Sequence, residues 1–205
     1  MMWRVLAFSG LLGLIAIACG GSEPAASVGV PEGYELYDGS ADGFLIALPS
    51  AWVVAEGDVA PFIAEAAEAV LEPGALEILR DSLASEPALF ALDATGNPNV
   101  NVILQPGPPG PMDAGRWEDL EAILRTQLSE LLGATVLSVD RVEYGGTEGL
   151  FSVFEVAYPT GLAEQHQYFM VTEDASFVIT FTSFDPAADR ETFAAVMETF
   201  TPVAG

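Results

Sequence analysis

The spacing of apolar residues along the chain changes repeatedly between two patterns. Residues 100–104 and 177–181 alternate apolar with other side chains, whereas residues 117–131 carry apolar side chains on one helical face. Alternation is typical of β-strands, and a spacing of three to four residues is typical of helices. A chain that mixes both patterns has to bury helix faces against a sheet, which predicts an α+β fold.

The apolar segments are separated by short turn sequences, which favour antiparallel pairing. Asp-Gly at residues 42–43, Gly-Gly at 145–146 and Glu-Asp at 173–174 each separate two strand-like segments. The candidate strands are residues 34–37, 44–48, 89–93, 100–104, 136–144, 150–158, 164–172 and 177–182. We therefore expect an antiparallel sheet of about six to seven strands with helices packed on its faces, and residues 52–55 leaving the sheet.

Three segments are predicted to be helical. Residues 58–84 form the first, capped by Asp58 and divided by Pro-Gly at residues 73–74. Residues 115–132 form a strongly amphipathic helix, and Asp185 caps a last helix that ends near residue 200. The sequence Pro-Gly-Pro-Pro-Gly-Pro at residues 106–111 is incompatible with a helix or a central strand, so we expect an exposed loop there.

The order of these elements resembles that of a known superfamily. The sequence Phe-Leu-Ile-Ala-Leu-Pro-Ser-Ala-Trp at residues 44–52 is similar to the opening of PsbP-like domains. The Asn-Pro-Asn-Val-Asn-Val strand at 97–102, the amphipathic helix and a last helix ending in Thr199-Phe200 follow in the same order. The resemblance covers residues 34–201 and includes the bacterial lipoprotein branch of LpqN-like and DcrB-like proteins. It implies a sheet used as a docking surface for protein partners, with no catalytic residues carried over.

The N-terminal segment has the pattern of a secretory signal that ends at the chain's single cysteine. Arg4 precedes 14 mostly apolar residues at 5–18. As a helix they would be ~21 Å long, too short for a ~30 Å hydrocarbon core. The sequence Ala-Ile-Ala-Cys ending at Cys19 resembles the bacterial lipoprotein box. We therefore expect residues 1–18 to be a signal peptide and Cys19 to be lipidated. The alternative is an ordinary secretory signal, which would leave Cys19 as a free thiol.

This signal predicts the organisation and location of the rest of the chain. Residues 19–32, rich in Gly, Ser, Pro and Ala, read as a lipidated N-terminus and tether with a reach of ~20 Å. Residues 33–205 then form a single domain, expected to be monomeric and without disulfides. The predicted location is the extracytoplasmic face of a bacterial cell membrane, or the outer membrane if the source has two membranes.

Charge limits the partners of this domain. The chain contains 30 acidic residues against six basic ones, and its net charge is −24. Such a surface repels nucleic acid and anionic lipid headgroups, so nucleic acid is excluded as a partner. The acidity is explained by solubility and compositional bias, by adaptation to high salt, or by attraction to a cationic partner or divalent metal.

His166, the only histidine, is the main catalytic candidate. It lies in a predicted strand. Its role is that of a general base, a metal ligand or, in the interpretation we favour, a strand-surface or hydrogen-bonded residue. No G-x-S-x-G elbow accompanies it. Residues 93–99 superficially resemble a calcium loop but fit a hairpin turn better, and Glu65, Glu68 and Glu72 fit a solvated helix face. We expect no catalytic residue, metal or cofactor.

Four residues are weak candidates for partner binding. Trp52 and Trp117 would suit a partner groove, although we favour packing in the protein core for both. Pro108 and Pro109 belong to the Pro-Gly loop, whose polyproline geometry would lose little entropy on binding, although such loops are as often inert.

The sequence thus favours a membrane-tethered, non-enzymatic module that binds a protein of the cell envelope. The alternatives are a small-ligand carrier with a cleft between sheet and helix and, less favoured, an extracytoplasmic hydrolase using His166 or a pair of carboxylates.

Overall fold

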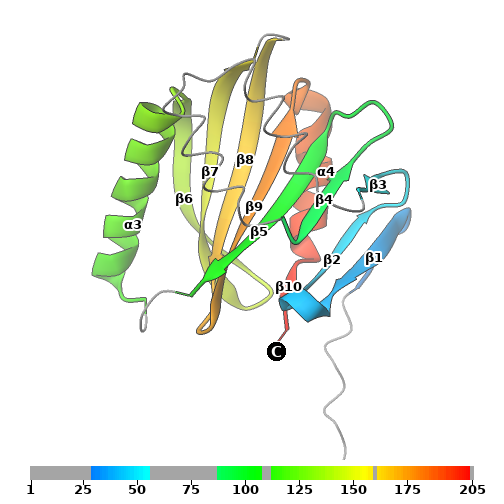
Figure 1. Ribbon diagram of the computed structural model, residues 1–205, viewed down its shortest axis with the longest axis horizontal. Coiled ribbons are helices and arrows are strands. Elements are labelled where there is room, and N and C mark those ends of the chain that lie inside the picture. The colour runs from blue at the N-terminus through cyan, green and yellow to red at the C-terminus, as the bar shows by residue number, and fades with distance from the viewer. Residues whose placement is uncertain (1–28, 56–86, 108–111, 159–160, 204–205) are drawn as a thin grey trace, which may run out of the picture.

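In the residues that the structure describes, the fold combines two antiparallel sheets with two α-helices (Figure 1). The computed structural model describes residues 29–55, 87–107, 112–158 and 161–203. Within them, seven strands form a large sheet in the order β3-β4-β5-β9-β8-β7-β6, and three form a small sheet in the order β1-β2-β10. This arrangement confirms the predicted α+β class.

The elements have the following bounds. The large sheet contains β3 (Val53–Val54), β4 (Leu89–Leu92), β5 (Asn99–Pro106), β6 (Thr135–Tyr144), β7 (Thr147–Tyr158), β8 (Gly161–Val171) and β9 (Ala175–Ser183). The small sheet contains β1 (Tyr34–Gly39), β2 (Phe44–Pro49) and β10 (Thr201–Pro202). The helices are α3 (Ala114–Thr126), which continues into a π-helical segment (Gln127–Leu131), and α4 (Pro186–Glu198), and a 3₁₀ turn (Ser40–Asp42) joins β1 to β2.

The first hairpin forms as the sequence predicts, but it does not join the large sheet. β1 pairs with β2 from Tyr34 opposite Pro49 to Gly39 opposite Phe44. Strand β2 then pairs with β10 after α4, and the Ala47 amide donates to Thr199 Oγ1 at 2.7 Å. These contacts attach β2 to the C-terminal end of the chain. Residues 52–55 leave the hairpin and supply β3, which pairs with β4 at the edge of the large sheet.

Strand β9 joins the two halves of the large sheet. It pairs with β5 along eight residues and with β8 on its other edge. Phe177, Ile179 and Phe181 alternate along β9 and are buried on the face that α4 covers. The alternation seen in the sequence therefore marks the strand at the centre of the core.

The main core lies between this face, α4 and β2. Its buried members come from β2, β4, β5, β8, β9, α4 and the residues just after α4: Phe44, Ile46, Leu48, Leu89, Ala91, Val100, Val102, Tyr168, Met170, Phe177, Ile179, Phe181, Phe193, Val196, Met197 and Phe200. Aromatic rings dominate it. Phe181 stacks on Phe193 with centroids 4.7 Å apart, and Phe177 meets Phe200 edge-on at 5.4 Å. Such pairs add to the free energy gained by burial alone.

The opposite face of the sheet is covered by α3 over β6 and β7. Trp117 packs with Val139 and Leu150, and Leu128 packs with Phe154 farther along the helix. Glu121 and Arg125, four residues apart on α3, form an ion pair, with Arg125 Nε and Glu121 Oε1 3.0 Å apart. The amphipathic helix expected at residues 115–132 is thus confirmed, although its last turn widens to π-helical geometry.

Two local predictions need correction. Pro106 is not loop but the last residue of β5, opposite Ala175 of β9. A proline is tolerated there because β4 pairs with β5 only as far as Val102, so no strand of the described structure pairs with that edge of β5 at Pro106. Asp185 occupies the N-cap position of α4 and Pro186 opens the helix, as predicted, but the Asp185 side chain makes no capping hydrogen bond. Instead, Ser183 Oγ accepts from the Asp185 amide at 2.8 Å.

The helix predicted at residues 58–84 and most of the Pro-Gly loop lie outside the described residues. No helix in the described ranges is both long and apolar enough to cross a bilayer.

Gly149 provides a test of how closely the sheet packs. It lies in β7 opposite Met170, and a Cβ atom there would be 2.5 Å from the Phe169 carbonyl oxygen and 2.6 Å from Met170 Sδ. Because part of this obstacle is backbone, Gly149→Ala should lower the free energy of unfolding by about 2 kcal/mol. Chemical denaturation monitored by circular dichroism measures the change.

Gly115→Ala is the matched control. Gly115 lies in α3, where an added Cβ meets only Asp113 Oδ1 at an ordinary 3.5 Å. Alanine favours a helix over glycine, so this variant should be unchanged or more stable by up to about 1 kcal/mol. Equal effects of the two substitutions would contradict the close packing of β7 against β8.

Candidate functional site

His166 lies in β8 and is buried on the face of the sheet that α4 covers. Its exposed fraction is 6%, and its ring lies between those of Phe151 and Phe193, with each centroid 5.5 Å away. Of the two forms of the favoured interpretation, the structure excludes a strand-surface histidine and shows a hydrogen-bonded one.

The partner of His166 is Glu164, two residues earlier on the same strand. Nε2 of His166 and Oε1 of Glu164 are 2.6 Å apart. Arg190 of α4 holds the same carboxylate with two hydrogen bonds, from Nε to Oε1 at 2.9 Å and from Nη2 to Oε2 at 2.6 Å. Glu164 is only 5% exposed, so its charge is almost fully removed from water and is compensated by the guanidinium.

The electrostatics of Glu164 follow from these contacts. The hydrogen bonds from Arg190 lower the pKa of Glu164, burial opposes them, and the hydrogen bond with His166 lowers the pKa further. The net direction is downward, so the carboxylate stays charged. The same contact raises the pKa of Arg190. The resulting cluster of Glu164, His166 and Arg190 ties β8 to α4, and we call it the β8–α4 ion cluster.

The contacts of this cluster fit a structural role better than a catalytic one. A general base has to reach a substrate proton, but His166 is buried and bonded to Glu164. Ser183, opposite Glu164 on β9, is also fully buried, and its hydroxyl donates to Asp189 Oδ2 at 2.5 Å. The side chains of Glu164, His166 and Ser183 are thus each hydrogen-bonded within the fold.

Sequence reasoning missed Glu164 and Arg190 as partners of His166. A signal existed for Glu164, because residues two apart on a strand share a face. Arg190 offered none, since it lies 26 residues away from Glu164 on a helix.

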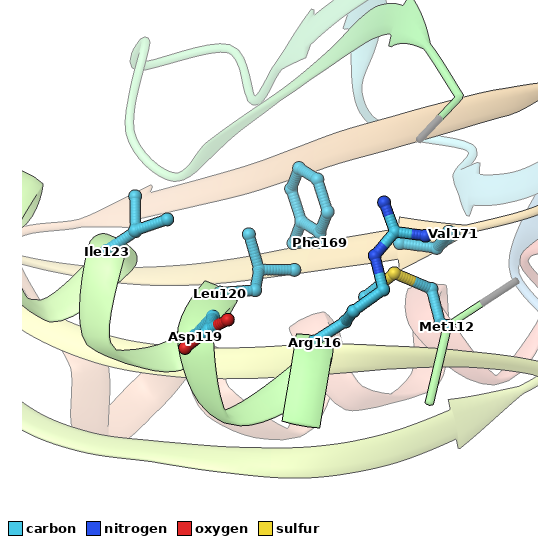
Figure 2. Close-up of a pocket in the computed structure, with 7 residues that line it drawn as sticks. All are labelled: Met112, Arg116, Asp119, Leu120, Ile123, Phe169 and Val171. Carbon is cyan, nitrogen blue, oxygen red and sulfur yellow. The ribbon is translucent and has the colours of Figure 1, made fainter. Parts of the chain in front are cut away.

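A second feature lies on the opposite face of the sheet, between α3 and β8. It is an open groove of about 230 Å³ (Figure 2). Leu120 and Ile123 of α3 lie along one wall and Phe169 of β8 along the other, while Arg116 extends toward Val171. The full lining comprises Met112, Arg116, Asp119, Leu120, Ile123, Phe169 and Val171. We call this feature the α3–β8 groove.

The groove exists because α3 covers only part of this face. Trp117 of α3 and Leu128 of the π-helical segment are buried over β6 and β7, so the side of the helix that carries Ile123 projects beyond them toward β8. Ile123 is 51% exposed, unusual for a large apolar residue beside a core. Its apolar neighbours Leu120, Phe169 and Val171 are partly exposed, so the groove is a mainly apolar hollow in contact with solvent.

The two tryptophans proposed for partner binding both contribute to the protein interior. Trp117 is 2% exposed, and the guanidinium carbon of Arg141 lies 5.0 Å from its ring centroid. Its indole Nε1 is buried without a hydrogen-bond partner in the described structure. Trp52 is partly buried and packs against the main core. Core packing, the simpler alternative, describes both positions.

The remaining candidates divide into one that the structure describes and several that it does not. At residues 93–99 Asp93 Oδ1 accepts hydrogen bonds from the amides of Thr95 and Asn97, as in a hairpin turn. The Thr95 hydroxyl also donates to Asp93 Oδ1, at 2.6 Å. This side-chain bond, followed by the amide bonds, lowers the pKa of Asp93. In the described ranges no group of three or more potential metal ligands occurs. The candidates that lie outside the described residues are Cys19, Glu65, Glu68, Glu72, Pro108 and Pro109.

Solved structures of other proteins share the fold of this chain, although its sequence matches no known family. No protein-family model matches the chain, and no curated protein sequence matches it. The chain is similar to the solution structure of cyanobacterial PsbP (CyanoP) from Synechocystis sp. PCC 6803, with a TM-score of 0.57, 11% identity, and coverage of 89% of this chain and 99% of that one. It is also similar to LpqN of Mycobacterium tuberculosis, a protein involved in cell envelope biogenesis, with a TM-score of 0.50, 15% identity, and coverage of 78% and 83%.

These matches confirm the resemblance proposed from the order of the elements. The chain has a PsbP-like α+β fold, which the bacterial protein LpqN shares. At 11% and 15% identity the likeness concerns the fold, and function has to be argued from the surface of this chain.

Removing Arg190 tests the β8–α4 ion cluster. Arg190→Ala should lower the free energy of unfolding at neutral pH by more than the control below, because Glu164, which is only 5% exposed, loses its cation. Water screens part of this interaction, since the Arg190 side chain is 57% exposed. In the wild type the pKa of Glu164 is lowered, so its contribution to stability is present above the unfolded-state pKa and is lost as pH falls through the folded-state value. The gap between variant and wild type should therefore shrink at acidic pH. Urea denaturation at pH 7 and at pH 4 measures it.

Arg125→Ala is the control for this prediction. Arg125 forms an ion pair with Glu121 in which both side chains are more than one-third exposed. Exposed pairs contribute little, so this variant should lose no more than about 0.5 kcal/mol at either pH. If Arg190→Ala behaved in the same way, the structural role of the cluster would be wrong.

Proposed function

We propose that this protein is a membrane-tethered extracytoplasmic lipoprotein whose domain is a non-enzymatic module that binds a protein of the cell envelope. The observation that carries the proposal is the pairing of a PsbP-like fold with a lipoprotein-type N-terminus at Cys19. The similarity to LpqN, a protein involved in cell envelope biogenesis, supports an accessory role in the same compartment.

The two faces of the sheet support binding rather than catalysis. On the α4 face His166, the residue best suited to acid–base chemistry, is buried in the β8–α4 ion cluster. On the α3 face the α3–β8 groove presents apolar side chains to solvent. An exposed apolar hollow with few polar groups is suited to holding a partner.

The small-ligand carrier remains the second candidate because of the same groove. Its volume, about 230 Å³, lies below the ~300–1,000 Å³ typical of pockets that enclose a ligand. It is also open on one side, so a ligand would keep much of its surface in water. A side chain of a larger partner fits these dimensions better.

The lipid anchor has a direct test. Cys19 is the only cysteine, so no other residue provides a thiol for the thioether. In cells fed a labelled lipid precursor, Cys19→Ser should abolish labelling of the protein and stop lipoprotein-type processing. Metabolic labelling followed by immunoprecipitation measures both. Undiminished labelling of the variant would refute the anchor.

The non-enzymatic proposal is tested by capture of partners in the native membrane. Wild type and His166→Gln are each cross-linked in intact cells, and the captured proteins are identified and quantified. We expect one reproducible set of envelope proteins and capture within about threefold between the two, since ~0.5 kcal/mol is typical of changes away from a binding surface. A loss of cellular function confined to His166→Gln, with folding and capture intact, would favour the hydrolase instead.

A further inference from the structure

We propose that the α3–β8 groove receives an apolar side chain from a cationic segment of the partner protein. This inference rests on the proposed function and names the surface and the chemistry of its partner. Three properties of the groove carry it: its lining, its size and the charges around it.

The lining calls for an apolar group. Leu120 and Ile123 from α3 and Phe169 from β8 face the same space (Figure 2). Ile123 is half exposed, so covering it removes apolar surface from water at about 25 cal/mol per Å². A polar group placed between these side chains would lose its water without gaining a hydrogen bond from them.

The size calls for one or two side chains rather than an entire molecule. The groove is open to solvent, and Asp119 and Ile123 of α3 are exposed at its edge, which would let a partner backbone pass over it while one anchor enters. Anchors of this kind, usually large apolar or aromatic residues, provide most of the binding free energy in protein interfaces.

The surrounding charges call for a cationic segment. Asp119 lies on the helix wall of the groove, and exposed Glu173 and Asp174 follow Val171 in the turn from β8 to β9. Arg116, the one basic residue of the lining, is already engaged within the molecule. The chain as a whole carries a net charge of −24. Lysine or arginine residues beside the anchor would therefore be attracted, and acidic segments repelled.

The experiment selects binders from a displayed library of random peptides on the purified full chain. We expect enriched peptides to share an aromatic or aliphatic anchor next to lysine or arginine. Their affinity should fall about tenfold or more for Ile123→Asp, as expected for the loss of an anchor contact. Circular dichroism verifies that each variant is folded.

Leu137→Asp is the matched control, because Leu137 is also 51% exposed but lies on β6, outside the groove. It should leave the affinity within about threefold. Ile123→Ala is the second groove variant, since alanine favours a helix, and it should also weaken binding. The pair Asp119→Lys and Asp140→Lys tests the charge: the first should weaken binding more than the second, and added salt should reduce that difference.

Three outcomes would overturn the inference: no enrichment, enrichment of acidic or anchorless peptides, or equal affinity for wild type and Ile123→Asp. The proposed function fails separately. If cross-linking of the wild type in the membrane captures no protein, the binding module itself is wrong. If Ile123→Asp captures partners as well as the wild type does, the module stands and the groove is not its surface.

Discussion

The pairing of β5 with β9 is the contact on which the rest of the domain depends. It joins β3, β4 and β5 to the meander of β6 to β9, although the two strands come from distant parts of the chain. Bringing such segments together costs loop-closure entropy, and burial of apolar side chains has to offset that cost. Phe177, Ile179 and Phe181 of β9 do so, because each is buried under α4 and β2. Helix α4 and the small sheet both pack against this strand, through Phe193 on Phe181 and Phe44 on Phe177.

The two faces of the sheet serve different purposes because the helices cover them differently. Helix α4 lies over the centre of its face, where it buries aromatic rings and fixes Glu164 through Arg190. Helix α3 lies over the edge formed by β6 and β7, so part of the other face stays open at β8. The closed face stabilises the domain, and the open face provides the groove that we propose as a docking surface. Glu164, which is buried, is paired with Arg190, so its charge is compensated inside the domain.

Local sequence patterns predicted most elements of the described structure but not how the elements associate. The four strands from β6 to β9 and their turns follow from alternation and from Gly or Asp residues in the turns, and the last helix, α4, forms where it was predicted. The small sheet was not predicted, because alternation shows which side of a strand is buried and not which strand lies beside it. For the same reason Pro106 was assigned to a loop, although a strand beside it ends early enough to leave room for proline.

The sequence by itself determined the class of fold, the PsbP-like order of elements, the acidic surface and the absence of a disulfide, since these depend on composition and on neighbours along the chain. Only the tertiary structure decided the burial and hydrogen bonding of His166 and the existence of the groove. His166 is buried beside a charged carboxylate, Glu164, and this arrangement depends on Arg190, which lies on a later helix and compensates the charge of Glu164. The groove exists because α3 covers one edge of a sheet wider than the helix. Both depend on contacts between residues far apart in sequence, which no local pattern encodes.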